Sequence, residues 1–278
     1  MVSPLRWREP RPSTPRQNIW RALATTALQI ARTALSEPYQ LTIERRVIHL
    51  RRLPPELDRF RIVQLSDLHH SPLTGRAQIE RAVEIANELM PDMVALTGDY
   101  VSHEREYAAP CAEMLGRLRA RCGVYAVLGN HDHWTDAPLV TDLLRAEGIQ
   151  VLINEGRRFE ARGGSFWLAG VDDAMVGLED LALALAGSRE DEMKLVLAHN
   201  PTILRRAARH GVDLILAGHT HGGQIAWPRR RRARRRLLQG LGCLGETQIY
   251  VSRGIGTVVL PVRYGCPPEI SLLELRTA

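Results

Sequence analysis

The chain has 278 residues, of which 45% are hydrophobic and 24% charged, a globular composition with enough length to bury a large core. The formal net charge of +6 does not indicate a basic surface overall. Seven arginines lie between positions 229 and 236, and they contribute more positive charge than the net charge of the whole chain. The four cysteines show no C-x-x-C spacing, which argues against a zinc ribbon or a disulfide scaffold: they are Cys111, Cys122, Cys243 and Cys266.

The N-terminal part of the chain differs from the rest. Residues 1–17 combine four arginines with four prolines, so we expect disorder there. In residues 18–36, apolar side chains recur at spacings of three and four, which predicts an amphipathic helix. This helix is too short and too interrupted by arginine to span a bilayer, and it lacks the apolar core of a cleaved export signal. Two interpretations stay open: the helix lies on a membrane surface, or it docks on the protein's own body.

Residues 37–278 are expected to form one α/β domain. Five short apolar runs each end in a polar residue: RIVQLS (61–66), MVALTG (93–98), VYAVLG (124–129), KLVLA (194–198) and DLILAG (213–218). Helical patterns are expected between the strands, at 77–90, 104–120, 138–147, 178–187 and 201–210. Alternating strands and helices predict α/β layers with several parallel strand pairs.

Further strands indicate a second sheet. The segment RFEARGGSFWLAGV (158–171) predicts a hairpin that turns at residues 162–164. Near the C-terminus, three segments have the β-rich apolar pattern of strands: QIYVS (248–252), TVVLPV (257–262) and ISLLEL (270–275). We therefore expect a second sheet packed on the first.

The residues that follow the five strands have the chemistry of metal ligands. Active sites of α/β sheets gather at the carboxyl ends of the strands, and the candidates there are Asp67, His69, Asp99, Asn130, His199, His219 and His221. A single catalytic zinc needs three protein ligands, so this larger set fits two divalent ions that share a bridging carboxylate. Mixed imidazole and carboxylate ligands suit manganese first, with iron, zinc or magnesium as alternatives, and do not suit calcium.

The motifs D-x-H, G-D, G-N-H-D, a lone histidine at a strand end, and G-H-x-H occur in this order. Together, over about residues 60–275, they resemble the calcineurin-like metallophosphoesterase superfamily. This resemblance implies a four-layer αββα sandwich of two mixed β-sheets flanked by helices, with metal ligands at the strand ends. Within that site, one ion is expected on Asp67, His69, Asp99 and His221, and the other on Asp99, Asn130, His199 and His219.

The resemblance also implies a mechanism. Asp99 would bridge the ions, and a hydroxide held between them would attack phosphorus without a protein-bound intermediate. His131 is expected to be the catalytic histidine near the leaving-group oxygen, with Asp132 orienting its ring. The loop pair Asp172 and Asp173 follows the strand that ends at Val171 and could reach the site, but solvation is the expected state of such a pair. His103 is expected on the surface.

The segments HTHGGQI (219–225) and SRGIGTVVLPVRYGCPPEISLLEL (252–275) resemble a bacterial branch that includes membrane-associated phosphoesterases. Some members of that branch hydrolyse the pyrophosphate of UDP-2,3-diacylglucosamine in lipid A synthesis. The arginine-rich insert 228–240 is expected beside the active-site mouth, where each charge near an anionic membrane contributes about 1 kcal/mol. A solvated loop is the second interpretation and a nucleic-acid contact the third, because no aromatic residues interleave the arginines.

We therefore expect an enzyme at the cytoplasmic side of the inner membrane, bound peripherally to an anionic surface, that hydrolyses a lipid-linked phosphodiester or pyrophosphate. The alternative is a soluble nucleotide phosphodiesterase or nuclease with the same dimetal site. A noncatalytic metal-binding scaffold is disfavoured, because no expected ligand is missing. No protein partner is implied, and nucleic acid is not expected as a partner.

Overall fold

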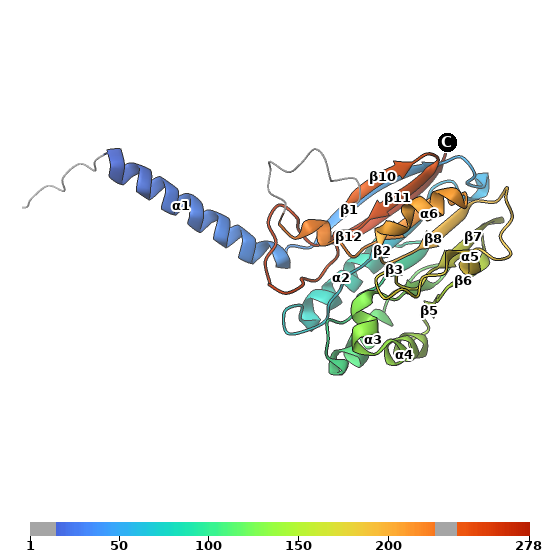
Figure 1. Cartoon of the computed structure of the whole chain (residues 1–278), viewed down its shortest axis with the longest axis horizontal. Coiled ribbons are helices and arrows are strands. Elements are labelled where there is room, and N and C mark those ends of the chain that lie inside the picture. The colour runs from blue at the N-terminus through green and yellow to red at the C-terminus, as the bar shows by residue number, and fades with distance from the viewer. Residues whose placement is uncertain (1–14, 226–237) are drawn as a thin grey trace, which may run out of the picture.

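The computed structural model of the protein describes residues 15–225 and 238–278 (Figure 1). Helix α1 (Pro15–Ser36) begins three residues before the expected helix, so the expected disorder of 1–17 is wrong for residues 15–17. Proline is tolerated in a first helical turn, because the N–H that it lacks would have no partner there. The rest of that segment, and the insert 228–240 except its last three residues, lie outside the described residues. Within the described ranges, no helix is both long and apolar enough to cross a membrane.

The first sheet has six strands in the order β1-β12-β2-β3-β4-β5. Strands β2 to β5 are parallel to one another, while β12 pairs antiparallel with β2 and parallel with β1. The bounds are β1 (Thr42–Leu50), β2 (Phe60–Leu65), β3 (Met93–Thr97), β4 (Val124–Val127), β5 (Gln150–Val151) and β12 (Glu269–Thr277). The predicted parallel β2, β3 and β4 and the predicted C-terminal strand at 270–275 are confirmed.

The second sheet also has six strands, in the order β10-β11-β9-β8-β7-β6. Its central strands are parallel, and antiparallel β10 and β6 close its two edges. The bounds are β6 (Glu155–Ala161), β7 (Gly164–Gly170), β8 (Lys194–Leu197), β9 (Leu214–Ala217), β10 (Gly240–Leu244) and β11 (Thr247–Val251). The predicted hairpin is confirmed as β6 and β7.

The strand expected at TVVLPV (257–262) is wrong, because this segment is a loop whose tip is exposed. Val259 has φ +65°, outside the range of strands, and its side chain is 85% exposed. The amides of Leu260 and Val262 donate to carbonyls only two residues earlier, at 2.7 and 2.8 Å, which turns the chain tightly. Pro261 has no amide to donate to a neighbouring strand.

Three apolar cores separate four layers, as expected. Helices α2 (Arg76–Glu88), α3 (Ala108–Leu115) and α4 (Asn130–Ala146) cover the first sheet. The two sheets enclose a second core, in which the rings of Phe60, Phe159 and Phe166 meet at centroid distances of 4.6 to 6.2 Å. Short helices α5 (Leu181–Ala184) and α6 (Leu204–Arg209) cover the second sheet.

Short 3₁₀ turns complete the fold: η1 (Glu37–Tyr39), η2 (Pro55–Leu57), η3 (Arg105–Tyr107), η4 (Pro201–Ile203) and η5 (His221–Gly223). The two sheets end side by side, because the Gln64 side chain at the end of β2 donates to the Ala217 carbonyl at the end of β9 at 2.9 Å. Loops from both sheets therefore meet at one rim of the sandwich.

Candidate metal centre

The structure brings all seven expected metal ligands together at this rim. Each lies in a loop within a few residues of a strand end or, for Asn130, at the first residue of α4. All are buried except His219, which is half-buried. Buried carboxylates and imidazoles need partners, so their gathering in one place indicates a site for cations.

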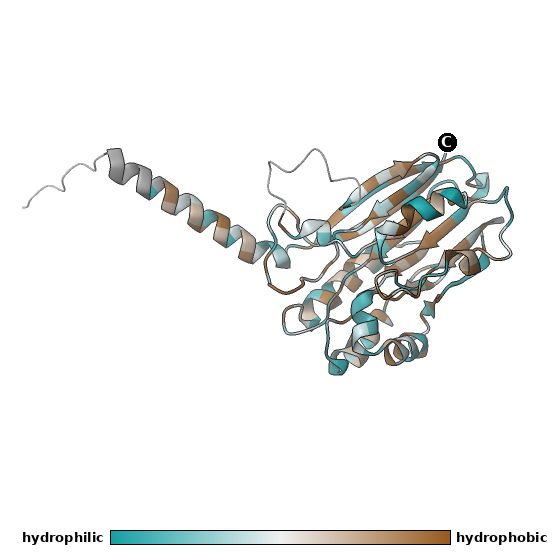
Figure 2. Ribbon diagram, viewed as in Figure 1, coloured by the Kyte–Doolittle hydropathy of each residue, from teal (hydrophilic) through white to brown (hydrophobic). Residues whose placement is uncertain are grey.

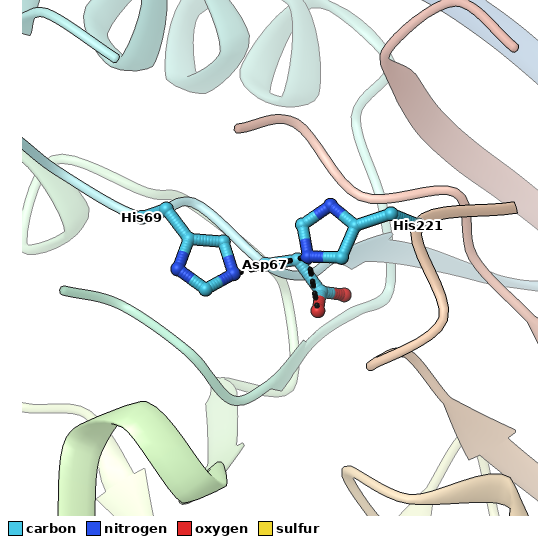
Figure 3. Close-up of side chains that lie close together, drawn as sticks. All are labelled: Asp67, His69 and His221. Carbon is cyan, nitrogen blue, oxygen red and sulfur yellow. Dashed lines mark hydrogen bonds and ion pairs between the residues drawn. The ribbon is translucent and has the colours of Figure 1, made fainter. Parts of the chain in front are cut away.

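One group of ligand atoms comes from Asp67, His69 and His221. Figure 3 shows the two imidazoles turning ring nitrogens toward each other beside the carboxylate. The His69 and His221 Nε2 atoms are 3.0 Å apart, and His221 Nε2 lies 3.4 Å from Asp67 Oδ1. Atoms that bind one ion at about 2.0 to 2.2 Å lie about 3.0 to 3.5 Å from each other. The spacing therefore fits a shared metal ion.

A second group comes from Asp99, His199 and His219. His199 Nε2 lies 3.1 Å from Asp99 Oδ2 and 3.2 Å from His219 Nδ1. The same Asp99 oxygen is 3.5 Å from His69 Nε2 of the first group. Asp99 therefore lies between the two groups, where a bridging carboxylate is needed.

Asn130 supplies an independent test of whether these residues fit a metal. Its Oδ1 atom is buried and has no hydrogen-bond partner among the described residues. An unpaired buried oxygen is costly unless something satisfies it, and a neutral amide oxygen is a suitable ligand for a hard divalent ion. The donor set therefore fits divalent metal ions, whose identity the ligands leave open.

Hydrogen bonds with the backbone orient several of these side chains. His199 Nδ1 lies 2.7 Å from the Thr97 carbonyl, which leaves Nε2 for a ligand. The amide of His219 donates to Asp67 at 2.9 Å, and the amide of His131 donates to Asp99 Oδ1 at 2.9 Å. Such outer contacts fix the orientation of metal ligands and tune their basicity.

The loops that hold the ligands adopt unusual backbone conformations. Five of the seven proposed ligands have φ between +48° and +70°: Asp67, His69, Asp99, His219 and His221. Non-glycine residues in this left-handed region cost about 1 to 3 kcal/mol each and cluster at functional sites. Gly98, with φ +87°, makes one close approach possible, since a Cβ there would lie 2.6 Å from the Gly129 amide nitrogen and 2.8 Å from His199 Nδ1.

Burial and charge set the protonation of the imidazoles. Burial lowers the pKa of His69 and that of His221 to about 3, so both rings are neutral and keep a lone pair. Burial has the same effect on His199, but the Asp99 carboxylate outweighs it and raises the pKa of His199 to about 10. The imidazoles in turn lower the pKa of Asp99 despite its burial. His199 therefore has to lose a proton before its Nε2 can bind a metal ion.

His131 lies beside the two groups, with its ring against His69 at a centroid distance of 4.7 Å. Its Nδ1 is 2.8 Å from the carbonyl of Ser102. Two residues that the sequence did not single out for the site flank the ring: His103 at 5.0 Å and Trp134 at 4.8 Å. Both are exposed, so His103 is a surface residue as expected but also borders the site.

The expected role of Asp132 is wrong. Its carboxylate does not orient the His131 ring, which the Ser102 carbonyl holds instead; it accepts hydrogen bonds at 2.8 Å from the amides of Gly129, Asp99 and Tyr100. Helix α4 is interrupted at Asp136 (φ −176°, ψ 88°), so a short helical segment from Asn130 precedes the helix expected from 138. Asp132 lies in the first turn of that segment and reaches back to the cap. Asp132 therefore joins the loop after β3 to the start of α4.

The expected solvation of Asp172 and Asp173 is also wrong, because both are buried. Asp172 accepts a 2.6 Å hydrogen bond from His133, and this contact raises the pKa of His133. A signal for this pair was present in the sequence: both aspartates follow β7, just as the ligands follow the other parallel strands.

Comparisons with known proteins identify the family. A family model described as calcineurin-like phosphoesterase matches residues 60–223, and the chain belongs to this family. A "Transmembrane protein with metallophosphoesterase domain" from Bos taurus is 36% identical over 277 residues, which are 92% of this chain and 62% of that protein. "Phosphodiesterase YaeI" from Escherichia coli (strain K12) is 32% identical over 225 residues, which are 78% of this chain and 82% of that protein.

Among solved structures, the sulfate thiohydrolase SoxB of Thermus thermophilus has a TM-score of 0.50 at 15% identity, covering 81% of this chain and 57% of that one. This likeness concerns the fold alone. The chain spans 62% of the bovine relative and 56% of a Danio rerio relative of the same description. The expected family and four-layer fold are confirmed, while the narrower bacterial branch stays a prediction.

Proposed function

We propose that the protein is a metal-dependent phosphoesterase whose two ions are held by Asp67, His69, Asp99 and His221 and by Asp99, Asn130, His199 and His219. The observation that supports this most is the position of Asp99 Oδ2, 3.1 Å from His199 Nε2 and 3.5 Å from His69 Nε2. When bound, the two ions supply Lewis acidity and make hydroxide available near neutral pH. Manganese is the proposed metal, with iron, zinc and magnesium as alternatives.

The protein's own contribution to the chemistry centres on His131. Because the Ser102 carbonyl can only accept a hydrogen bond, His131 Nδ1 carries a proton and donates a 2.8 Å hydrogen bond to that carbonyl. Nε2 is then the nitrogen that holds or releases a proton, and we assign it to the leaving-group oxygen. General acid catalysis of this kind contributes about 10² to 10⁴-fold to a rate.

The proposed substrate is a lipid-linked phosphodiester or pyrophosphate, such as UDP-2,3-diacylglucosamine, at the cytoplasmic surface of the inner membrane. Two features support this choice: the basic helix α1, and the seven arginines in 229–236 of the sequence. The relatives described as transmembrane proteins with a metallophosphoesterase domain also support a membrane setting. The relative described as a phosphodiesterase equally supports the alternative of a soluble phosphodiesterase.

Hydrolysis of bis-p-nitrophenyl phosphate tests the catalytic part of the proposal. The manganese-loaded protein should turn over this diester, and Asp99→Ala and His131→Ala should each lower kcat by about 10² or more while the protein stays folded. His210→Ala, at an exposed histidine after α6, is the matched control and should keep full activity. Full activity in both site variants would refute the proposed mechanism.

A second assay addresses the substrate class. Lipid extracts incubated with the wild type and with His131→Ala can be compared by mass spectrometry. Loss of a phospholipid or nucleotide-lipid species with the wild type alone supports the lipid-linked substrate. Turnover of cyclic nucleotides or nucleic acid with no change in the lipids supports the soluble alternative.

A further inference from the structure

Helix α1 leaves the body of the protein with its apolar side chains uncovered. Figure 1 shows the helix pointing away from the sheets, joined to them only at its C-terminal end, and Figure 2 shows apolar residues along the coloured part of the helix. Leu23, Leu28 and Leu35 are each more than half exposed. Most of the stability of a helix in a protein comes from packing of its amphipathic face, so α1 needs a surface that covers its apolar stripe.

A second exposed apolar feature lies at the attached end of α1. In the loop 257–262, Val259 is 85% and Leu260 59% exposed, and nearby Ile225 is 55% exposed. This loop is tied to the helix, because the Arg263 amide donates to the Ala34 carbonyl at 3.0 Å. We call α1 together with Ile225, Val259 and Leu260 the apolar end.

The apolar end is also tied to the metal centre. Gln224, three residues after the proposed ligand His221, clamps the loop: its side chain accepts from the Val258 amide at 2.7 Å and donates to the Val258 carbonyl at 3.2 Å. Its backbone carbonyl accepts from the Tyr264 amide at 2.9 Å. These bonds hold the exposed side chains of the loop at a fixed position relative to the turn that contains His219 and His221.

The shape and charge of the apolar end indicate what covers it. Its side chains protrude from a helix and a loop tip, a shape that can insert into the interface of a lipid bilayer. The charged residues of α1 are all basic, Arg16, Arg21 and Arg32, with no aspartate or glutamate between residues 15 and 36. Two copies of this helix would repel each other, while an anionic surface attracts it.

We propose that the apolar end docks on an anionic lipid bilayer, with α1 lying in the interface and Val259 and Leu260 entering the acyl region. The docked loop holds the His219–His221 turn next to the headgroups, where a lipid phosphoester is located. This last step rests on the proposed phosphoesterase function, whereas docking itself does not.

Vesicle flotation of the full chain tests the docking. The wild type should float with phosphatidylcholine vesicles that contain phosphatidylglycerol, and less with phosphatidylcholine alone. The double variant Val259→Asp with Leu260→Asp should bind at least about tenfold more weakly, because two apolar side chains no longer enter the bilayer. Arg21→Glu with Arg32→Glu should remove the preference for phosphatidylglycerol.

The matched control replaces two apolar residues away from α1 that are also more than half exposed, Leu178→Asp with Leu183→Asp, and should float like the wild type. All variants should hydrolyse soluble bis-p-nitrophenyl phosphate at the wild-type rate, so a failure of docking and a failure of the proposed activity are distinguished. Flotation of the loop variant equal to that of the control would overturn the proposal. So would a wild type that ignores vesicles and sediments as a dimer that the loop variant dissociates.

Discussion

Replacing Asp132 with alanine gives a direct test of the role that the structure assigns to this carboxylate. Three buried amides, those of Gly129, Asp99 and Tyr100, each donate to it at 2.8 Å. A buried amide left without an acceptor costs about 1 to 3 kcal/mol, so three cost at least about 3 kcal/mol. Water entering the space of the lost carboxylate satisfies part of this demand, and we expect a loss of about 4 kcal/mol in the free energy of unfolding.

Asparagine at position 132 should restore only part of this stability. One carboxylate oxygen accepts from Gly129 and Asp99, and the other from Tyr100. An asparagine has a single acceptor oxygen, so its NH₂ group must face at least one amide donor. Asp132→Asn should therefore be intermediate between the wild type and Asp132→Ala.

Urea unfolding measures these differences, and hydrogen exchange locates them. The amides of Gly129, Asp99 and Tyr100 should lose protection first, because their acceptor is gone. Asp142→Ala, at an exposed position on the same helix, is the control and should change stability by less than about 0.5 kcal/mol. If Asp132→Ala abolished hydrolysis while the free energy of unfolding fell by less than about 1 kcal/mol, the carboxylate would act on His131 and the structural role would be refuted.

Other substitutions test separate parts of the site and fold. Gly98→Ala combines a left-handed φ of +87° with a Cβ 2.6 Å from the next loop, so it should lose about 2 to 5 kcal/mol, measured by urea unfolding; a loss below 1 kcal/mol would contradict the close approach. Asn130→Ala should lower the metal content toward one ion per chain, measured by mass spectrometry, and an unchanged content would remove Asn130 from the ligands. Burial alone would raise the pKa of Asp92, but the Arg61 amide, Arg121 and Arg162 lower it below 3.8. Its pairing therefore stabilises the fold above about pH 4 and is lost as the pH falls through the lower folded pKa. Asp92→Asn should cost about 2 kcal/mol at neutral pH, and unfolding curves below pH 4 should converge with those of the wild type; parallel curves would refute the pairing.

Much of the metal centre was predictable from the sequence because of a geometric rule. Parallel strands of one sheet end at the same edge, so residues that follow such strands are neighbours even when they are far apart in the chain. Asp67 and Asp99 follow neighbouring strands of the first sheet, so their closeness followed from that rule. His199 follows β8 of the second sheet, and its approach to them depends on how the two sheets pack. The same rule placed Asp172 and Asp173, after β7, within reach of the site, but it did not predict that both would be buried.

The sequence was less informative where local pattern and tertiary contacts disagree. The segment 257–262 is as apolar as a strand, yet its backbone turns at Val259 and two of its amides donate to carbonyls within the same segment. Asp132 adjoins His131, the proposed catalytic histidine, in sequence, but the helical turn that begins at Asn130 directs its carboxylate to the backbone of the neighbouring loop. Neither the loop at 257–262 nor the contacts of Asp132 can be derived from the spacing of residues in the sequence. Each depends on which backbone groups lie within hydrogen-bonding distance in the folded protein.

The sequence by itself determined the succession of strands and helices, because apolar periodicity is a local property of the chain. It also determined which residues follow each strand and therefore lie at its carboxyl end. Only the tertiary structure decided that one oxygen of Asp99 faces ligands from both groups, and that α1 and Val259 are left uncovered together at one end of the molecule. Those facts depend on how two sheets are packed and how their loops cross, and that packing is set by long-range burial and hydrogen bonding over the whole chain.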